Sequence, residues 1–155
     1  MNEREIWIAG LHLSDRRLTH TFGVEKAALA IAARHFPALS EAEVSAAALL
    51  HDCLEDTDAS FDEISHMFGQ TVAELVEGVT KLTRVQYSTT EEQQMENLRK
   101  MFMAMSKDIR VILIKIADRL HNTRTLQHQT PAKQISKSME TMEILSLIHI
   151  SEPTR

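Results

Sequence analysis

The sequence has 155 residues, of which 43% are hydrophobic and 25% are charged, and this composition is ordinary for a single compact domain. Only three prolines, four glycines and 5% aromatic residues are present. That composition argues against a β-sandwich or barrel, because those folds need many turns and strands rich in β-branched or aromatic residues. The formal net charge of −5 argues against a general nucleic-acid-binding protein.

The sequence also indicates the compartment in which the protein resides. No apolar run approaches the roughly 18 residues that cross a membrane, and the first residues lack the pattern of a signal peptide. The single cysteine, Cys53, excludes an internal disulfide framework and favours a reducing compartment. We therefore expect a cytoplasmic protein without membrane or nucleic-acid partners.

The chain reads as a series of helices joined by short connections, with Pro37 marking one break. Helices are expected over residues 2–13, 17–35, 40–56, 60–68, 71–79, 89–105, 108–126 and 130–144, and a loop over 81–88. Three of these helices begin with the S/T-x-x-E capping pattern, at Ser40 and Glu43, Ser60 and Glu63, and Thr89 and Glu92.

The apolar run at residues 111–114 could be a buried strand on periodicity alone. Its length, and the polar sequence D-R-L-H-N-T-R that follows, favour a buried helix instead. Thr130 and Pro131 then form an N-cap followed by proline at the first helical position. The predicted fold class is all-α, with about seven or eight helices.

The first candidate site is the sequence His51-Asp52-Cys53-Leu54-Glu55-Asp56, directly after an apolar run. On a continuous helix His51 and Glu55 share one face, and Asp52 and Asp56 share the adjacent face. Three acidic groups at the C-terminal end of a helix oppose its dipole and repel one another. A divalent cation would relieve this repulsion; the alternative is a solvated acidic helix end.

A second cluster follows the buried helix, where Asp118, Asn122 and Thr125 lie on one helical face. A carboxylate at the end of an apolar helix needs a compensating charge. That charge is either a metal ion or an ion pair with Arg119 or Arg124. Imidazole together with carboxylates is a suitable ligand set for Mn²⁺, Fe²⁺ or Zn²⁺.

His20 is the third candidate, although a histidine near a helix start is often a cap or a surface residue. The remaining histidines lack a comparable acidic context and are interpreted as structural or solvated. Apart from His149 in the C-terminal tail, they are His12, His35, His66, His121 and His128.

The order His20, His51-Asp52, Asp118 is that of HD-domain phosphohydrolases. Three stretches resemble the hydrolase domain of RelA/SpoT-type alarmone enzymes: A-A-L-L-H-D-C-L-E-D-T at 47–57, F-G-Q-T-V-A-E-L-V-E-G-V-T-K-L-T at 68–83, and I-K-I-A-D-R-L-H-N-T-R-T-L at 114–126. The resemblance covers about residues 42–144, and its fold is an HD-domain helical bundle.

The resemblance implies a hydrolase that removes the 3′-pyrophosphate from guanosine tetraphosphate or pentaphosphate with one Mn²⁺. Its metal ligands match His20, His51, Asp52 and Asp118. Its acidic pair, which orients or activates the attacking water, matches Glu55 and Asp56. Its nucleotide-contacting positions match Asn122, with Arg124, Thr125 and Lys81 nearby.

The segment before His20 departs from the alarmone enzymes. R-x-x-H-T-x-G-V at residues 17–24 instead looks like the opening of general HD phosphohydrolases, and 31 positions separate His20 from His51. The basic residues that would contact guanine are therefore not assigned beyond Arg16 and Arg17 as candidates. Two alternatives stay open: an HD phosphohydrolase of another nucleotide or dinucleotide polyphosphate, and a non-catalytic HD module that regulates an attached synthetase.

The last eleven residues, L-S-L-I-H-I-S-E-P-T-R at 145–155, resemble the in-frame translation of a sequencing-library adapter. We therefore expect an HD-type hydrolase domain over 1–144, incomplete at its C-terminus, and a non-native tail. A synthetase domain is expected downstream in the full-length protein. The apolar side chains of this tail, at positions 145, 147, 148 and 150, are expected to pack poorly.

Overall fold

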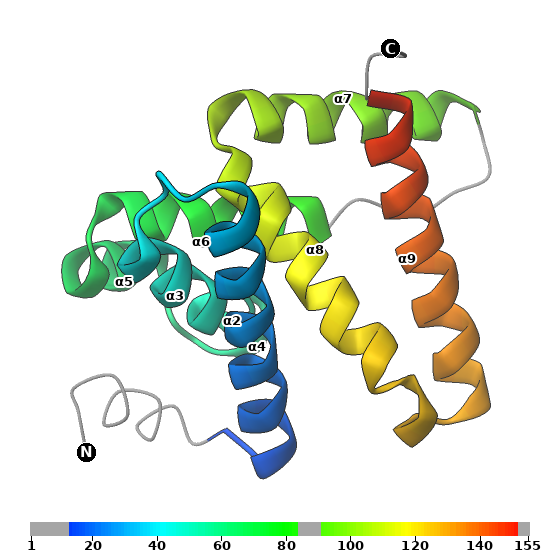
Figure 1. The fold of residues 1–155 in the computed structure, drawn as a ribbon, viewed down its shortest axis with the longest axis horizontal. Coiled ribbons are helices and arrows are strands. Elements are labelled where there is room, and N and C mark those ends of the chain that lie inside the picture. The colour runs from blue at the N-terminus through cyan, green and yellow to red at the C-terminus, as the bar shows by residue number, and fades with distance from the viewer. Residues whose placement is uncertain (1–12, 84–90, 152–155) are drawn as a thin grey trace.

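The computed structural model describes residues 13–83 and 91–151. The helices are α2 (Asp15–His35), α3 (Glu41–Leu50), α4 (Cys53–Asp56), α5 (Phe61–Phe68), α6 (Gln70–Thr83), α7 (Glu91–Lys107), α8 (Ile109–Arg124), the 3₁₀ turn η1 (Leu126–His128) and α9 (Pro131–Ser151). No strand occurs among the described residues, so the all-α prediction is confirmed. Figure 1 shows α7 lying across one end of the bundle and α9 along one side.

Helix α8 is the central element, since α2, α3, α6, α7 and α9 all pack against it (Figure 1). Its first turns carry the apolar run from Val111 to Ile114, and all four side chains are buried. A helix covered on several sides can be apolar at consecutive positions, which explains why its sequence also resembles a buried strand.

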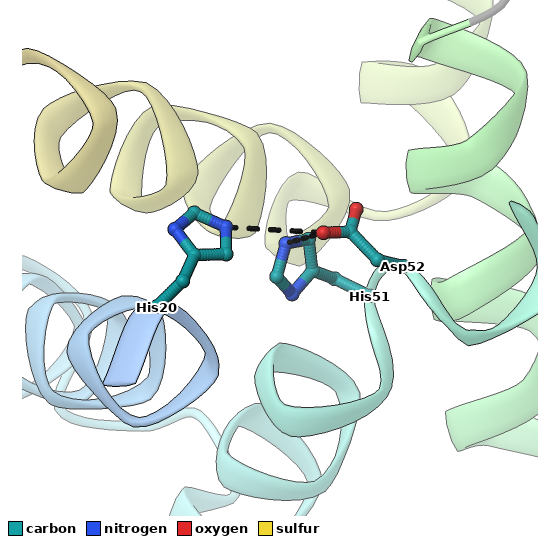
Figure 2. A group of neighbouring side chains, drawn as sticks. All are labelled: His20, His51 and Asp52. Atoms are coloured by element: carbon teal, nitrogen blue, oxygen red, sulfur yellow. Dashed lines mark ion pairs between the residues drawn. The ribbon is translucent and has the colours of Figure 1, made fainter. Parts of the chain in front are cut away.

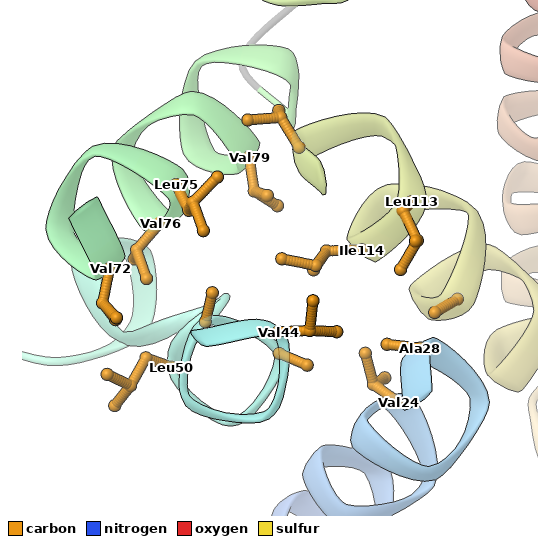
Figure 3. Close-up of a cluster of buried hydrophobic side chains, with 14 of the residues drawn as sticks. Val24, Ala28, Val44, Leu50, Val72, Leu75, Val76, Val79, Leu113 and Ile114 are labelled. Carbon is orange, nitrogen blue, oxygen red and sulfur yellow. The ribbon is translucent and has the colours of Figure 1, made fainter. Parts of the chain in front are cut away.

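The core lies between α2, α3, α6 and the start of α8 (Figure 3). Fully buried side chains include Val24 of α2, Val44 of α3, Val76 of α6 and Ile114 of α8. The core holds α2, α3 and α8 at fixed positions, and these are the elements that carry the candidate site residues.

The capping patterns in the sequence correctly predicted where α3 and α5 begin. Ser60 and Glu63 form a complete capping box, in which the Ser60 hydroxyl accepts from the Glu63 N–H and the Glu63 carboxylate accepts from the Ser60 N–H at 2.8 Å. The Ser40 hydroxyl accepts from the Glu43 N–H at the start of α3. Helix α2 begins two residues earlier than expected, because Ser14 caps it.

The expected continuous helix over 40–56 is wrong. Helix α3 ends at Leu50, the chain turns at His51 and Asp52, and α4 begins at Cys53. The Asp52 carbonyl accepts from the N–H groups of Glu55 and Asp56, which starts the new helical turn. His51 and Glu55 therefore do not lie on one face of a single helix.

Two other boundaries differ from the expectation. Helix α6 runs on to Thr83, so Lys81 lies on a helix and not in the expected loop. The helix expected over 2–13 and the segment 84–90, which includes Thr89, lie outside the described residues, apart from Leu13 just before α2.

Helix α9 begins at Pro131, as expected, and continues without a break past Ile144 to Ser151. Ile144 is buried, whereas the Leu145 side chain is 46% exposed. The other apolar side chains of the tail fall outside the described set, so their poor packing and the division at residue 144 stay predictions. Within the described part of the chain, no helix is long and apolar enough to cross a membrane.

Arg110 joins the starts of two helices. Its Nε donates to the Asp108 carboxylate at 3.0 Å, and its Nη1 pairs with Glu43 in the first turn of α3. Asp108 is also the N-cap of α8, since its Oδ1 accepts from the Arg110 backbone N–H. The hydrogen bond from the Arg110 side chain holds the pKa of Asp108 below its ordinary value.

Replacing Arg110→Ala should lower the free energy of unfolding by about 1–3 kcal/mol, because two carboxylates lose a part-buried charged partner. Arg99→Ala is the control, since its pair with Glu96 is exposed and worth at most about 0.5 kcal/mol. Urea unfolding at pH 7 and pH 3 measures both. A depressed Asp108 pKa stabilises the fold above about pH 4 and less at lower pH, so the Arg110 difference should shrink at pH 3. An equal effect of both variants would contradict the assignment.

Candidate functional site

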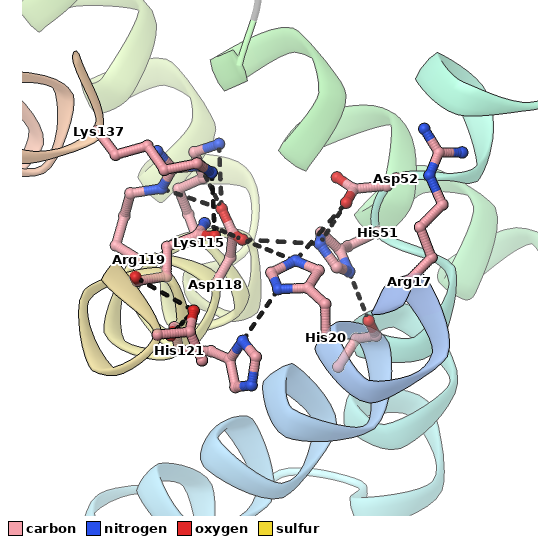
Figure 4. Close-up of polar contacts among 12 residues, drawn as sticks. Arg17, His20, His51, Asp52, Lys115, Asp118, Arg119, His121 and Lys137 are labelled. Carbon is pink, nitrogen blue, oxygen red and sulfur yellow. Dashed lines mark hydrogen bonds and ion pairs between the residues drawn. The ribbon is translucent and has the colours of Figure 1, made fainter. Parts of the chain in front are cut away.

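The four predicted metal ligands come from three separate segments. His20 lies on α2, His51 and Asp52 form the turn between α3 and α4, and Asp118 lies in the second half of α8 (Figure 4). Helices α2, α3 and α8 are packed together by the core. The packing therefore brings residues nearly a hundred positions apart into contact.

Their polar atoms converge on one another. The His51 Nε2 lies 2.9 Å from Asp52 Oδ2, and the His20 Nε2 lies 3.2 Å from Asp118 Oδ1. The crossed distances, from His20 Nε2 to Asp52 Oδ2 and from His51 Nε2 to Asp118 Oδ1, are both 3.8 Å. One ligand atom each from His20, His51 and Asp52 lies within 4.8 Å of the others, so this group could hold a metal ion (Figure 2).

The proton position of His51 is determined by the backbone. Its Nδ1 lies 2.8 Å from the Ala48 carbonyl oxygen, which can only accept a hydrogen bond. Nδ1 therefore carries the proton, and the lone pair of the neutral ring is on Nε2. This buried Nε2 has no hydrogen bond of acceptable geometry among the described residues, despite the Asp52 oxygen nearby. A buried nitrogen lone pair that faces carboxylates fits a bound cation.

Asp118 is a buried carboxylate surrounded by donors. Arg119 Nη2 lies 2.6 Å and Lys115 Nζ 3.7 Å from Oδ2, while the Asn122 amide donates to Oδ1 at 2.8 Å. Burial raises the pKa of Asp118, but the close contact with His20 and the Arg119 charge outweigh it and hold that pKa well below its usual range. Of the two compensating charges that the sequence offered for Asp118, the ion pair with Arg119 is present at Oδ2, and the metal ion stays a prediction for Oδ1, which faces the histidines.

His51 and Asp52 are coupled as a pair. Burial lowers the pKa of His51, but the close contact with the Asp52 carboxylate, together with the charges of Asp52 and Asp118, raises it overall. Burial raises the pKa of Asp52, and the same contact with His51 lowers it overall.

A pocket lies beside this cluster and contains one member of the acidic pair. It is lined by Leu13, Arg17, His20, Thr21, Leu49, Asp52, Cys53, Asp56 and Thr57. Asp56 is held by Arg17, whose Nη2 lies 3.0 Å from Asp56 Oδ2. Glu55 is exposed on α4 next to it. Burial, and then the charges of Asp52 and Asp56, raise the pKa of Cys53 to about 12, so its thiol is not a nucleophile here.

The four residues expected to contact the nucleotide differ in how close they lie to the ligand cluster. Asn122 is buried beside Asp118, and its carbonyl oxygen accepts from Lys137 Nζ at 3.1 Å. The Thr125 hydroxyl donates to the His121 carbonyl at the end of α8. Arg124 is exposed in the last turn of α8, and Lys81 is exposed on α6 and paired with Glu77. Only Asn122 of these four touches a predicted ligand through a contact that we observe.

Sequence reasoning missed the contact of His121, which it had interpreted as structural or solvated. Its Nδ1 lies 3.0 Å from Nδ1 of His20. Burial, and then the charge of His20, lower the pKa of His121. Its position three residues after Asp118, nearly one helical turn, could have indicated a place beside the site.

This combination of an all-helical core with two histidines and two aspartates in one cluster defines a class of protein. The family model described as "HD domain" matches residues 7–148, and the chain belongs to the HD-domain family. The match includes all of α2 to α8, with the three segments that carry the site residues, and most of α9.

Particular relatives are similar over about two thirds of the chain. A probable guanosine-3′,5′-bis(diphosphate) 3′-pyrophosphohydrolase from Synechocystis is 54% identical over 101 residues, which are 65% of this chain and 13% of that protein. The bifunctional (p)ppGpp synthase/hydrolase SpoT of Escherichia coli is 54% identical over 104 residues, 67% of this chain and 15% of that protein. A GTP pyrophosphokinase from Myxococcus xanthus is 52% identical over 99 residues, 62% of this chain and 13% of that protein. The chain thus spans about one seventh of the length of these curated relatives.

One solved structure is also similar. It is reported as a metazoan ortholog of SpoT that hydrolyses ppGpp, with a TM-score of 0.58 and 26% identity, and the match covers 83% of this chain and 69% of that chain. The similarity in fold extends beyond the region matched by the curated relatives.

Asp118→Asn should lower the free energy of unfolding by about 3–5 kcal/mol at pH 7, because the buried charges of Arg119 and Lys115 then lose the Asp118 carboxylate that lies beside them. The depressed Asp118 pKa stabilises the fold above the unfolded value of about 4 and loses this effect as pH falls. The difference between variant and wild type should therefore narrow in acid. Urea unfolding at several pH values, with the exposed Asp58→Asn as control, tests this; a constant difference down to pH 2 would contradict it.

Proposed function

We propose that the chain is a metal-dependent phosphohydrolase that removes the 3′-pyrophosphate from guanosine tetraphosphate or pentaphosphate, leaving GDP or GTP. The observation that carries the proposal is the meeting of His20, His51, Asp52 and Asp118 in one cluster, beside a pocket that His20 and Asp52 line. The names of the Synechocystis and E. coli relatives support this substrate, since both refer to hydrolysis of that nucleotide and both proteins are 54% identical to the chain.

Mn²⁺ is the proposed ion, with His20, His51, Asp52 and Asp118 as its ligands. Two imidazole nitrogens and two carboxylate oxygens suit Mn²⁺, Fe²⁺ or Zn²⁺, and the resemblance to alarmone hydrolases favours Mn²⁺. The fit is supported by the buried His51 Nε2, whose lone pair faces carboxylates. When bound, such an ion lowers the pKa of a coordinated water and neutralises charge on phosphoryl oxygens.

The proposed proton acceptor is the Glu55–Asp56 pair. Asp56 shares the pocket wall with His20 and Asp52, and the Arg17 guanidinium holds it in an ion pair. A phosphate group in the pocket would compete for Arg17, because guanidinium pairs strongly with phosphate oxygens. Release of Arg17 to the substrate would leave the Asp56 carboxylate able to accept the proton of the attacking water.

The nucleotide itself is proposed to contact Asn122, Arg124, Thr125 and Lys81. The acidic ligand cluster needs cations beside it to hold a substrate with several phosphates. Arg17 on the pocket wall supports such a role more directly than Lys81, which is paired with Glu77.

The wider setting is also a proposal. We place the protein in the cytoplasm and its hydrolase unit in a longer chain that includes a synthetase domain. The E. coli relative is named as both synthase and hydrolase, and the chain matches only 15% of its length.

A second candidate is an HD phosphohydrolase of another nucleotide polyphosphate. The segment from Arg17 to Val24 favours it, because this segment resembles general HD phosphohydrolases and supplies both Arg17 and His20 to the pocket.

Incubation with guanosine tetraphosphate and Mn²⁺ should release pyrophosphate and GDP, and this assay tests the proposal. Side-by-side assays with guanosine pentaphosphate, ATP and diadenosine tetraphosphate distinguish the two candidates. Hydrolysis of the adenosine compounds but not of guanosine tetraphosphate would favour the second. No hydrolysis of any substrate by a protein that binds Mn²⁺ would contradict both.

The double variant Glu55→Gln/Asp56→Asn should lower kcat by about 100-fold or more, because general-base catalysis contributes about 10²–10⁴-fold. Its Mn²⁺ affinity should stay close to that of wild type, since neither residue is a proposed ligand. Arg99→Ala, on the exposed face of α7, is the matched control for both measurements. Retained hydrolysis in the double variant would remove the pair from the mechanism.

Mn²⁺ affinity should fall as the pH is lowered from 8 to 6. The metal needs a neutral His51, whose pKa is raised above its ordinary 6.5, so protons compete from a higher pH than at an isolated histidine. Below that raised pKa, His51 alone should weaken binding by about tenfold per pH unit. Calorimetric titration with Mn²⁺ measures this, and a constant affinity over the range would contradict it.

A further inference from the structure

The His20 ring is held between the ligand cluster and a second histidine. Its Nε2 faces Asp118 Oδ1 at 3.2 Å, and its Nδ1 lies 3.0 Å from Nδ1 of His121 (Figure 4). The two rings meet nearly edge to face, with centroids 4.9 Å apart. Two ring nitrogens at this distance must share one proton, because two lone pairs or two N–H groups would repel each other.

The direction of this hydrogen bond follows from the ligand role. A metal-binding imidazole offers a lone pair, and on His20 the nitrogen that faces the cluster is Nε2. A neutral imidazole carries a single N–H, so the His20 proton must then be on Nδ1. His20 Nδ1 donates, and His121 Nδ1 accepts with its own proton on Nε2.

The far edge of the His121 ring packs against the backbone of α2. A Cβ atom added at Gly23 would lie 2.1 Å from both Cδ2 and Nε2 of His121. Gly23 is three residues after His20, so the two positions are neighbours on one face of α2. The absence of a side chain at Gly23 is what allows the ring to lie against α2 with Nδ1 toward His20.

We propose that His121 is a positioning residue that fixes the tautomer and orientation of His20; this inference rests on the proposed function, in which His20 is a metal ligand. His51 has the equivalent support, since its Nδ1 donates to the Ala48 carbonyl. Each histidine of the cluster thus has a dedicated acceptor for its Nδ1 proton. Acceptors of this kind raise metal affinity because they orient the ring and select the tautomer.

Titration with Mn²⁺ compares two substitutions at position 121. His121→Phe keeps a flat ring but removes the acceptor, and it should weaken Mn²⁺ binding by about 10- to 100-fold. His121→Asn removes more of the ring, yet its Oδ1 lies as many bonds from the main chain as His Nδ1, and it should bind within a few-fold of wild type. If His121 only fills space, His121→Asn should weaken Mn²⁺ binding at least as much as His121→Phe does. Unchanged affinity of His121→Phe, or no rescue by Asn, would overturn the inference.

Nitrogen NMR of the imidazoles with Zn²⁺ bound gives a second readout that does not depend on turnover. We expect His121 with its proton on Nε2, and His20 with Nδ1 protonated and Nε2 shifted by the metal. A proton on Nδ1 of His121 would overturn the inference.

Two glycine variants provide a further comparison. Gly23→Ala should displace the His121 ring and weaken Mn²⁺ binding as His121→Phe does. Gly78→Ala is the matched control. Gly78 lies on α6, and a Cβ added there would also meet a side chain of α8, but that side chain is the apolar Val111, at 2.9 Å, and not His121. Equal Mn²⁺ affinities of these two glycine variants would count against the inference.

His51→Ala separates this inference from the function on which it rests. If wild type binds Mn²⁺ and His51→Ala does not, the metal site stands, and the variants at positions 121 and 23 test His121 alone. If wild type binds no Mn²⁺, the proposed metal site fails, and the inference fails with it.

Discussion

The ionised carboxylate of Asp118, buried on the central helix, is the constraint on which the rest of the arrangement depends. A charge at this depth persists only with close partners. The structure divides the partners between its two oxygens: Arg119 and Lys115 lie at Oδ2, and His20 and Asn122 lie at Oδ1. One side chain therefore connects the buried cations of the bundle to the histidine cluster.

The cationic side of Asp118 also involves the last helix. Arg119 pairs with Glu140 of α9, and Asn122 accepts from Lys137 of the same helix. Helix α9 thus contacts the two residues that orient the Asp118 carboxylate, although it contributes none of the proposed ligands. Helix α9 therefore affects the site through its charged side chains Lys137 and Glu140. Its outer face carries exposed apolar side chains such as Met139 and Met142.

Much of the fold could be predicted because its determinants are local. Capping residues such as Ser60 and a proline at the first position of α9 act within one turn, and a sequence shows them directly. The break at His51 could not be predicted, because no glycine or proline marks it. It depends on the side-chain contact of His51 with the Ala48 carbonyl and on the burial of the ring. The partnership of His20 with His121 links positions 101 apart, and only the packing of α2 on α8 creates it. Residues in motifs were accessible from sequence, whereas those that support them from another helix were not.

The hydrogen bond from the His51 Nδ1 to the Ala48 carbonyl has two roles. The last carbonyls of any helix lack partners within it, and here one of them is satisfied by an imidazole N–H. The same bond that terminates α3 also selects which nitrogen of His51 faces the carboxylates. Substitutions that improved α3 as a helix, by letting it run on through residues 51 and 52, would turn this nitrogen away from the cluster. Local helix stability and the proposed metal binding are therefore opposed at this turn, and a variant with a more stable α3 would be expected to bind the proposed ion more weakly.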